Sequence, residues 1–140
     1  MVGSGAIGCE LLKNFAMNAF SNSMGGCIYV TDPDVIENSN LSRQFLFRQQ
    51  HIRKPKAATA AAVAKQMNPN MKVIARLDRL GPQSADIYHH QFYSQLHCVA
   101  NALDNVQARL YVDSRCVECN TALVESGTLG PKGHVQVIIP

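Results

Sequence analysis

Three glycines near the start of the chain have the spacing of a phosphate-binding loop. Gly3, Gly5 and Gly8 form the pattern GxGxxG, and the apolar residues that follow them have helical spacing. Without Cβ atoms, the backbone can turn tightly and approach a phosphate at the N-terminus of that helix. Taken alone, the pattern also fits a tight turn that binds no ligand.

An acidic residue follows this loop at the distance expected for a ribose contact. Asp32 lies about 24 residues past Gly8, directly after a short β-branched run that predicts a strand. In a β-α-β nucleotide-binding unit, an acidic side chain at this place hydrogen-bonds the ribose hydroxyls. The two features together predict a nucleotide site. They do not distinguish NAD from ATP, because both contain adenosine.

The side chains near the phosphate end favour ATP. The segment after Asp32 is rich in amide and cationic side chains, namely Asn40, Arg43, Gln44, Arg48, Arg53 and Lys56. Arg43 can fork onto phosphate oxygens and Lys56 can act as a point charge, whereas Arg48 and Arg53 are explained by a solvated basic loop. Asp104, followed by Asn105, comes after another predicted strand and is well placed to hold Mg²⁺. Chemistry at the α-phosphate needs such cations, whereas the NAD pyrophosphate is held largely by backbone N–H groups.

The elements that must position these residues alternate along the chain. Helices are predicted from Gly8 onward, over 56–68, around Ile87, Phe92 and Leu96, and over 106–119. Strands are predicted over 27–31, 72–76, 98–103, 122–126 and 135–139, with turn-forming stretches at 21–26 and 127–133 and a long loop with one brief helical turn at 32–55. This order predicts a single α/β domain with a Rossmann-like, mainly parallel sheet and helices on both faces. Its first strand should precede Gly3 and is truncated, so we expect both ends to be cut.

Composition excludes several classes of protein. The chain has 140 residues and a net charge of +3, and its 13 Lys and Arg are scattered, so we expect no nucleic-acid partner. It has no leader-like segment and no apolar run near the roughly 20 residues of a spanning helix, so we expect no membrane association. The odd count of five cysteines favours reduced thiols, no disulfides, and a location in the cytoplasm and nucleus.

The cysteine and histidine pairs have plain structural explanations. Cys9 is predicted to pack in the core. Cys116 and Cys119 form a CxxC that lacks a second ligand pair, so we interpret it as a chance spacing. The adjacent histidines His89 and His90 lie among polar residues and Tyr88, which indicates a solvated loop or helix face.

Three long segments resemble the active adenylation half of ubiquitin-activating (E1) enzymes. They are TDPDVIENSNLSRQFLF (31–47), ANALDN (100–105) and ESGTLGPKGHVQVIIP (125–140), and the resemblance extends over the whole chain. It implies the adenylation fold of the ThiF, MoeB and E1 type. The turn SNSMGG (21–26) is more similar to ubiquitin E1 enzymes than to the SUMO-activating or bacterial relatives, which favours ubiquitin as the substrate and a related modifier second.

The resemblance also implies roles for individual residues. Ala6 would line the nucleotide pocket and Asp32 would hold the ribose with help from Asp34. The triphosphate would be surrounded by Asn40, Arg43, Gln44 and Lys56, and Asp104 with Asn105 would complete the site through Mg²⁺. Two positions depart from the family pattern, Ser42 for the usual Asn and Ser4 for the usual Ala.

The implied activity is ATP-dependent adenylation of the modifier's C-terminal carboxylate, with Arg43, Lys56 and Asp104 as catalytic residues. Thioester transfer would follow on a cysteine outside this chain. The implied partners are ubiquitin, an inactive adenylation half of the same protein, and ubiquitin-conjugating (E2) enzymes that bind through a ubiquitin-fold domain. We expect the isolated fragment to be poorly stable and inactive. A NAD-dependent oxidoreductase domain and a non-catalytic scaffold remain as alternatives.

Overall fold

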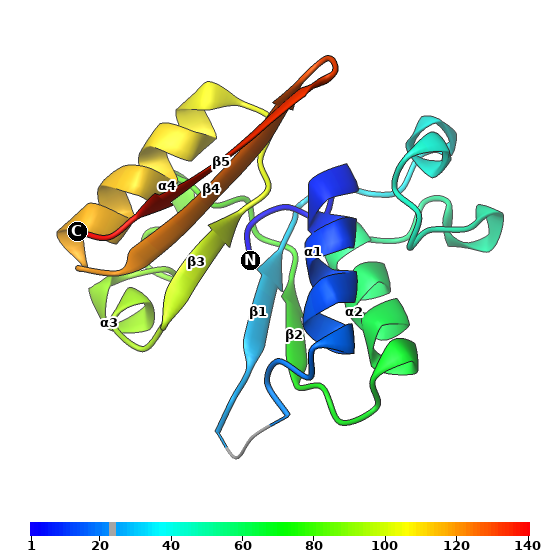
Figure 1. Cartoon of the computed structure of the whole chain (residues 1–140), viewed down its shortest axis with the longest axis horizontal. Helices are drawn as coiled ribbons and strands as arrows, with labels where there is room; N and C mark the ends of the chain where they lie inside the picture. The colour runs from blue at the N-terminus through cyan, green and yellow to red at the C-terminus, as the bar shows by residue number, and fades with distance from the viewer. Residues whose placement is uncertain (23–24) are drawn as a thin grey trace. The chain divides into compact units, whose positions relative to one another are not determined.

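A computed structural model describes residues 1–22 and 25–140, which form two compact units (Figure 1). The N-terminal unit is Gly3–Asp78, and the C-terminal unit is Met1–Val2 together with Arg79–Pro140. Each unit is described by itself. Ser23 and Met24, in the predicted turn 21–26, lie outside the described residues.

The N-terminal unit combines two helices with a pair of parallel strands. In chain order, its elements are α1 (Ala6–Met17), β1 (Ile28–Thr31), the 3₁₀ turns η1 (Asn38–Ser42) and η2 (Gln49–His51), α2 (Lys56–Met67) and β2 (Val73–Arg76). Strands β1 and β2 pair in parallel, with Ile28 opposite Val73 and Thr31 opposite Arg76. Helix α2 contacts β2 and α1, and the three elements lie next to one another in Figure 1.

The residue types of the two helices explain this packing. Helix α1 buries Cys9, Leu12 and Ala16, which share one face at helical spacing. Helix α2 is rich in alanine, the strongest helix former, and buries small side chains that let α1 approach closely. It ends at Met67, two residues before Pro69, which cannot continue a helix.

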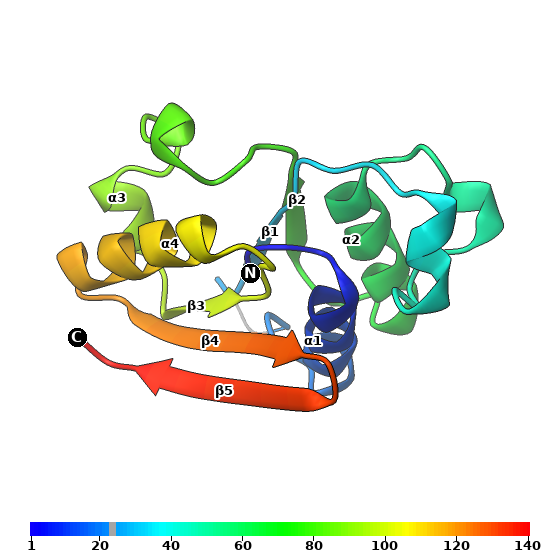
Figure 2. The same ribbon diagram turned by 90° about the horizontal axis from the view of Figure 1, so that it is seen from above.

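The C-terminal unit combines helices with a three-stranded sheet. Its elements are η3 (Pro82–Ser84), α3 (His90–Tyr93), β3 (Cys98–Asn101), α4 (Val106–Glu118), β4 (Ala122–Leu129) and β5 (Lys132–Ile138). The strand order is β3-β4-β5, with β3 and β4 parallel and β4 and β5 antiparallel. Figure 2 shows α4 running along the strands. Val2 adds a single parallel bridge to Asn101 beside β3.

One apolar core holds the C-terminal unit together. Its buried members come from every layer of the unit and are Val2, Leu80, Tyr88, Tyr93, Val99, Val112, Cys116, Cys119 and Leu123. Because Cys116 and Cys119 are part of this core, they behave as small apolar side chains. Burial raises the pKa of the Cys116 thiol to about 12.

The predicted α/β class and most elements are confirmed, with five corrections. Helix α1 begins at Ala6 instead of Gly8, and the long loop contains two short 3₁₀ turns instead of one. Around Phe92, only the four residues of α3 are helical. Most of 127–133 is strand, because Leu129 pairs with Lys132 and only two residues turn, including Gly130 with a φ of 58°. Tyr88 is buried, not solvated.

No helix in the described part of the chain is both long and apolar enough to cross a membrane.

Candidate nucleotide-binding site

The glycine loop is held between β1 and α1 by backbone contacts. Gly3 has a φ of 91°, a conformation that favours glycine, and its N–H donates to Thr31 O at 2.9 Å. Gly5 is the N-cap of α1 and supplies no side-chain cap, and the first turn carries no acidic residue. The N-terminal N–H groups of α1 therefore lack a side-chain acceptor from the cap, which suits them to bind an anion.

Asp32 fixes the shape of this loop. Its Oδ2 accepts from the N–H of Ser4 at 2.6 Å, and its Oδ1 accepts from the N–H of Asp34 at 2.9 Å. The residue is buried, with 6% of its surface exposed. One carboxylate thus ties the glycine loop to the segment that follows β1, so these two parts of the predicted site are brought together.

Opposing effects act on the pKa of the Asp32 carboxyl. Burial raises the pKa, and the N–H groups of Asp34 and Ser4 partly oppose that rise. A raised pKa means that the folded state binds the proton more tightly than the unfolded chain does. This carboxyl therefore stabilises the fold in acid and loses that contribution as the pH rises through its folded pKa.

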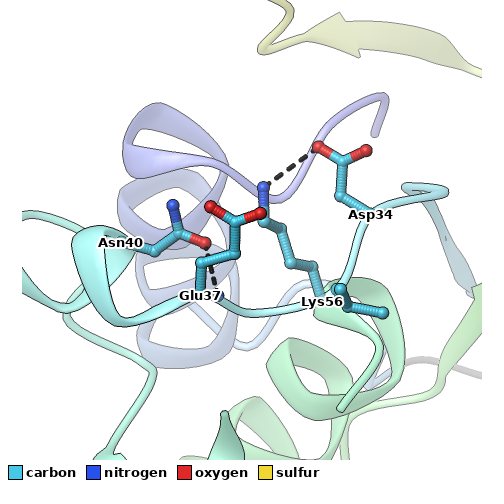
Figure 3. A pocket seen from close by; sticks show the side chains of 5 residues that line it. Asp34, Glu37, Asn40 and Lys56 are labelled. Atoms are coloured by element: carbon cyan, nitrogen blue, oxygen red, sulfur yellow. Dashed lines mark hydrogen bonds and ion pairs between the residues drawn. The ribbon is translucent and has the colours of Figure 1, made fainter. Parts of the chain in front are cut away.

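Lys56 and Asp34 form the polar end of a pocket. Lys56 is 8% exposed, its Nζ lies 3.1 Å from Asp34 Oδ2, and its N–H donates to Asp34 O at 2.9 Å. Figure 3 shows the lysine side chain pointing toward Asp34 across the pocket. The cavity has a volume of about 250 Å³ and is lined by Asp34, Val35, Glu37, Asn40 and Lys56. This volume is below the roughly 300–1,000 Å³ of typical ligand pockets and fits part of a nucleotide.

Two of the amide side chains predicted for the site, those of Asn40 and Gln44, are buried. Asn40 Oδ1 accepts from the N–H of Glu37 at 2.9 Å, which closes the first turn of η1. Gln44 lies against the glycine loop, since a Cβ on Gly5 would be 4.0 Å from Gln44 Nε2. Its Oε1 is buried without a partner among the described residues, so a bound ligand or water would satisfy it.

Arg43 differs from these residues because it is exposed. Its Nη1 donates to Ser39 O at 3.1 Å, and it is not among the described residues that line the pocket. The exposed Arg48 donates to Phe45 O and Phe47 O, and Arg53 is exposed as well. The role of Arg43 at the triphosphate stays a prediction.

Two pocket residues were missed by the sequence analysis. Val35 and Glu37 line the cavity together with the predicted residues. Glu37 stands three residues before Asn40, and this spacing at the start of a helical turn could have indicated it. No comparable signal marks Val35.

Asp104 and Asn105 belong to the C-terminal unit. Asp104 is exposed, and no described residue forms a hydrogen bond or ion pair with its carboxylate. Asn105 caps α4, accepting at Oδ1 from the N–H of Ala108 at 2.8 Å. Their part in a nucleotide site stays a prediction.

Cys9 and the two adjacent histidines have the surroundings that the sequence predicted for them. Cys9 is completely buried, which confirms its predicted place in the core, and burial raises the pKa of its thiol to about 11. His89 and His90 are both exposed. Within residues 1–22 and 25–140, no group of three His, Cys, Asp or Glu side chains could hold a metal ion.

Comparison with known proteins identifies the family to which the chain belongs. The sequence matches the ThiF family over residues 1–140. The chain belongs to the ThiF family. Over its full length it is 57% identical to human "Ubiquitin-like modifier-activating enzyme 1", 54% identical to Candida albicans "Ubiquitin-activating enzyme E1 1" and 50% identical to mouse "Ubiquitin-like modifier-activating enzyme 6". The ThiF-family chain spans 13%, 14% and 13% of these relatives, respectively.

Ser4, where the predicted family pattern has Ala, carries a buried polar group without a partner. The residue is completely buried and its hydroxyl has no hydrogen-bond partner in the described part of this ThiF-family chain. We expect Ser4→Ala to raise the free energy of unfolding by about 1 kcal/mol, because it removes an unsatisfied group. Urea unfolding would measure the change.

Ser84→Ala is the matched control for this substitution. Ser84 is also buried, but its hydroxyl donates to Arg79 O at 2.8 Å and accepts from the N–H of Gly81 at 3.2 Å. We expect its loss to lower the free energy of unfolding by about 1 kcal/mol. Equal destabilisation by both substitutions would contradict the assignment for Ser4.

Proposed function

We propose that the longer protein containing this chain activates a ubiquitin-like modifier, preferentially ubiquitin, by ATP-dependent adenylation of its C-terminal carboxylate. The names of the relatives support activation of ubiquitin-like modifiers. The cationic side chains predicted at the phosphate end, Arg43 and Lys56, support ATP as the nucleotide. Thioester transfer to a cysteine elsewhere in the protein would follow.

The observation that carries this proposal is the ion pair of Lys56 with Asp34. It lies beside the glycine loop, to which Asp32 is hydrogen-bonded through the N–H of Ser4. A largely buried ammonium at the start of α2 stands in the same pocket as Asn40, and its partner carboxylate is half-exposed. An ammonium in this setting can leave its carboxylate and bind a phosphate oxygen. A dinucleotide held only by backbone N–H groups would not need such a cation.

The proposed step is a displacement at phosphorus. An oxygen of the modifier carboxylate attacks the α-phosphorus, the bond to the α–β bridging oxygen breaks, and pyrophosphate leaves with that bonding pair. The products are an acyl-adenylate and pyrophosphate, and no protein nucleophile takes part. Lys56 and Arg43 would offset the negative charge that grows on the phosphates, and Asp32 would orient the ribose.

The carboxylate of Asp104 is suited to bind Mg²⁺. Mg²⁺ in nucleotide enzymes is bound by one or two carboxylates together with substrate phosphates, and it neutralises phosphate charge when it is bound. The carboxylate of Asp104 is exposed and free of partners within the described residues, as a ligand of this kind should be. We therefore assign Asp104 as the metal residue of the proposed reaction.

The partners follow from the same proposal. We infer that the longer protein contains an inactive adenylation half, a cysteine domain and a ubiquitin-fold domain, and that E2 enzymes bind through the last of these. A related modifier is the second candidate substrate, and the identity of 50% with an enzyme named "6" alongside enzymes named "1" supports keeping it.

ATP–pyrophosphate exchange by the full-length protein tests the proposal. Exchange should require ubiquitin, be absent without a modifier, and be weaker with a SUMO-type modifier. Asp104→Ala should lower the exchange rate by about 100-fold or more, because charge stabilisation at the phosphates is lost. Thermal unfolding with and without ATP checks that the variant remains folded.

Three other outcomes would each change the assignment. Exchange that responds only to another modifier would replace ubiquitin as the substrate. Tight NAD binding that is indifferent to Mg²⁺ would favour an oxidoreductase domain. Absence of exchange with every modifier and of ATP binding would favour a non-catalytic scaffold.

A further inference from the structure

A polar network surrounds the segment that carries Asp104. It connects the end of β3, the start of α4 and the middle of β4, all within the C-terminal unit. Its members are Asn101, Leu103, Arg109, Glu125 and Ser126. We call this set the Arg109 network.

Arg109 binds the backbone carbonyl of Leu103, the residue directly before Asp104. Its Nε and Nη2 both donate to Leu103 O, at 3.0 and 2.6 Å. The same Nη2 also donates to Ser126 O at 3.2 Å, which links this segment to β4. A planar guanidinium suits this task because several N–H groups are held in one rigid fork.

Glu125 holds the guanidinium in place. Its Oε1 lies 3.3 Å from Arg109 Nε, and the two side chains are only 13% and 23% exposed. Its Oε2 accepts from Asn101 Nδ2 at 2.5 Å, while Ser126 Oγ donates to Asn101 O at 2.7 Å. Low exposure makes each of these contacts stronger than it would be in water. Asn101 Oδ1 and Glu125 Oε1 accept no hydrogen bond from the described residues, so Glu125 Oε1 holds Arg109 through the ion pair alone.

The backbone after Asp104 is fixed as well. Asn105 caps α4 through Ala108, and Asn105 O accepts from the N–H of Arg109 at 3.2 Å. Asp104 thus lies between two anchored residues, although its own side chain has no partner among the described residues.

Gly127 leaves the space that the guanidinium occupies. A Cβ at this position would lie 2.5 Å from Arg109 Nη2, 2.7 Å from Arg109 Nη1 and 2.7 Å from His134 Cε1. Because Leu103, Ser126 and Glu125 hold the guanidinium, it cannot move away without losing those contacts.

We propose that Arg109 is a positioning residue that sets the place of the Asp104 carboxylate through Leu103 O. This inference rests on the proposed function, because it assumes that Asp104 binds Mg²⁺. A residue that orients a metal ligand without touching the metal alters metal affinity by about 10- to 100-fold when it is removed.

The test uses the full-length protein with Arg109→Ala, Arg109→Lys and Gly127→Ala, and with Arg115→Ala as a control from the same helix. Arg115 also pairs with a carboxylate, and within the described residues its hydrogen bond and ion pair are with Glu118, not with the Asp104 segment. The first readout is deuterium uptake by residues 102–108 without nucleotide. The second is the Mg²⁺ concentration that gives half-maximal ATP–pyrophosphate exchange.

We expect Arg109→Ala to accelerate deuterium uptake in 102–108 and to raise the half-maximal Mg²⁺ concentration by about tenfold or more. Arg109→Lys keeps the charge but not the fork, so it should resemble Arg109→Ala. Gly127→Ala keeps the arginine but displaces it, so it should change both readouts in the same direction. Arg115→Ala should leave both near the wild-type values.

Wild-type behaviour of Arg109→Lys in both readouts would overturn the positioning role and indicate that charge alone matters. Unchanged uptake in Arg109→Ala would also overturn it. A wild-type protein that shows no exchange would instead defeat the proposed function, and deuterium uptake would still decide whether Arg109 fixes this segment.

Discussion

Replacing Lys56 with Met should lower ATP–pyrophosphate exchange by the full-length protein by about 100- to 1,000-fold. Lys56 supplies a largely buried cation to the pocket, and a methionine of similar length keeps the volume but removes the charge. Stability should change little, by about 1 kcal/mol or less, because Asp34 is half-exposed and water can solvate its carboxylate after the loss. Exchange kinetics and thermal unfolding measure the two effects.

Lys54→Met is the control for this prediction. Lys54 lies two residues earlier and is exposed, so the same change of residue type should leave exchange within about twofold of wild type. If Lys56→Met retained a third or more of the wild-type rate, the pocket ammonium would have no substantial part in the reaction.

The second large effect is expected for Asp32→Asn. The Asp32 carboxylate uses one oxygen for Ser4 N–H and the other for Asp34 N–H, and an asparagine offers only one acceptor oxygen. One buried N–H then faces an NH₂ group, which costs about 1–3 kcal/mol and loosens the glycine loop. We expect the KM for ATP to rise by about 10- to 100-fold, because tenfold corresponds to about 1.4 kcal/mol.

Glu10→Gln provides the matched carboxylate-to-amide control. Glu10 lies on α1 and is exposed, and its ion pair with Lys13 at 2.7 Å is a surface contact. It should leave the KM for ATP unchanged. An Asp32→Asn enzyme with wild-type KM and wild-type stability would show that the double contact is not needed for the loop.

Several elements could be predicted because local patterns alone determine them. The alanine-rich run predicted a helix ending before Pro69, and α2 ends at Met67. The β-branched runs predicted β1 and β2 to within one residue. The hairpin was predicted less well, because the turn-forming residues of 127–133 suggested a long turn, whereas cross-strand pairing extends β4 to Leu129.

The site was predicted in residue type more than in arrangement. The contact of Lys56 with Asp34 joins residues 22 positions apart, and no local pattern reports it. The same holds for the Arg109 network, whose members Arg109 and Glu125 meet only because α4 packs along β4. The exposure of a side chain in this loop could not be predicted from the sequence either, since Gln44 is buried and its neighbour Arg43 is exposed.

By itself, the sequence determined the α/β class, the glycine loop with Asp32, and the resemblance to E1 adenylation halves. These follow from periodicity, spacing and residue type, which are local properties. Only the tertiary structure decided that Asp32 accepts hydrogen bonds from the N–H groups of both Ser4 and Asp34. It also decided that Lys56 is largely buried against Asp34 and that Arg109 donates to the carbonyl of Leu103, directly before Asp104. The physical reason is that hydrogen-bond satisfaction and burial depend on which distant segments pack together, and packing follows from the whole chain.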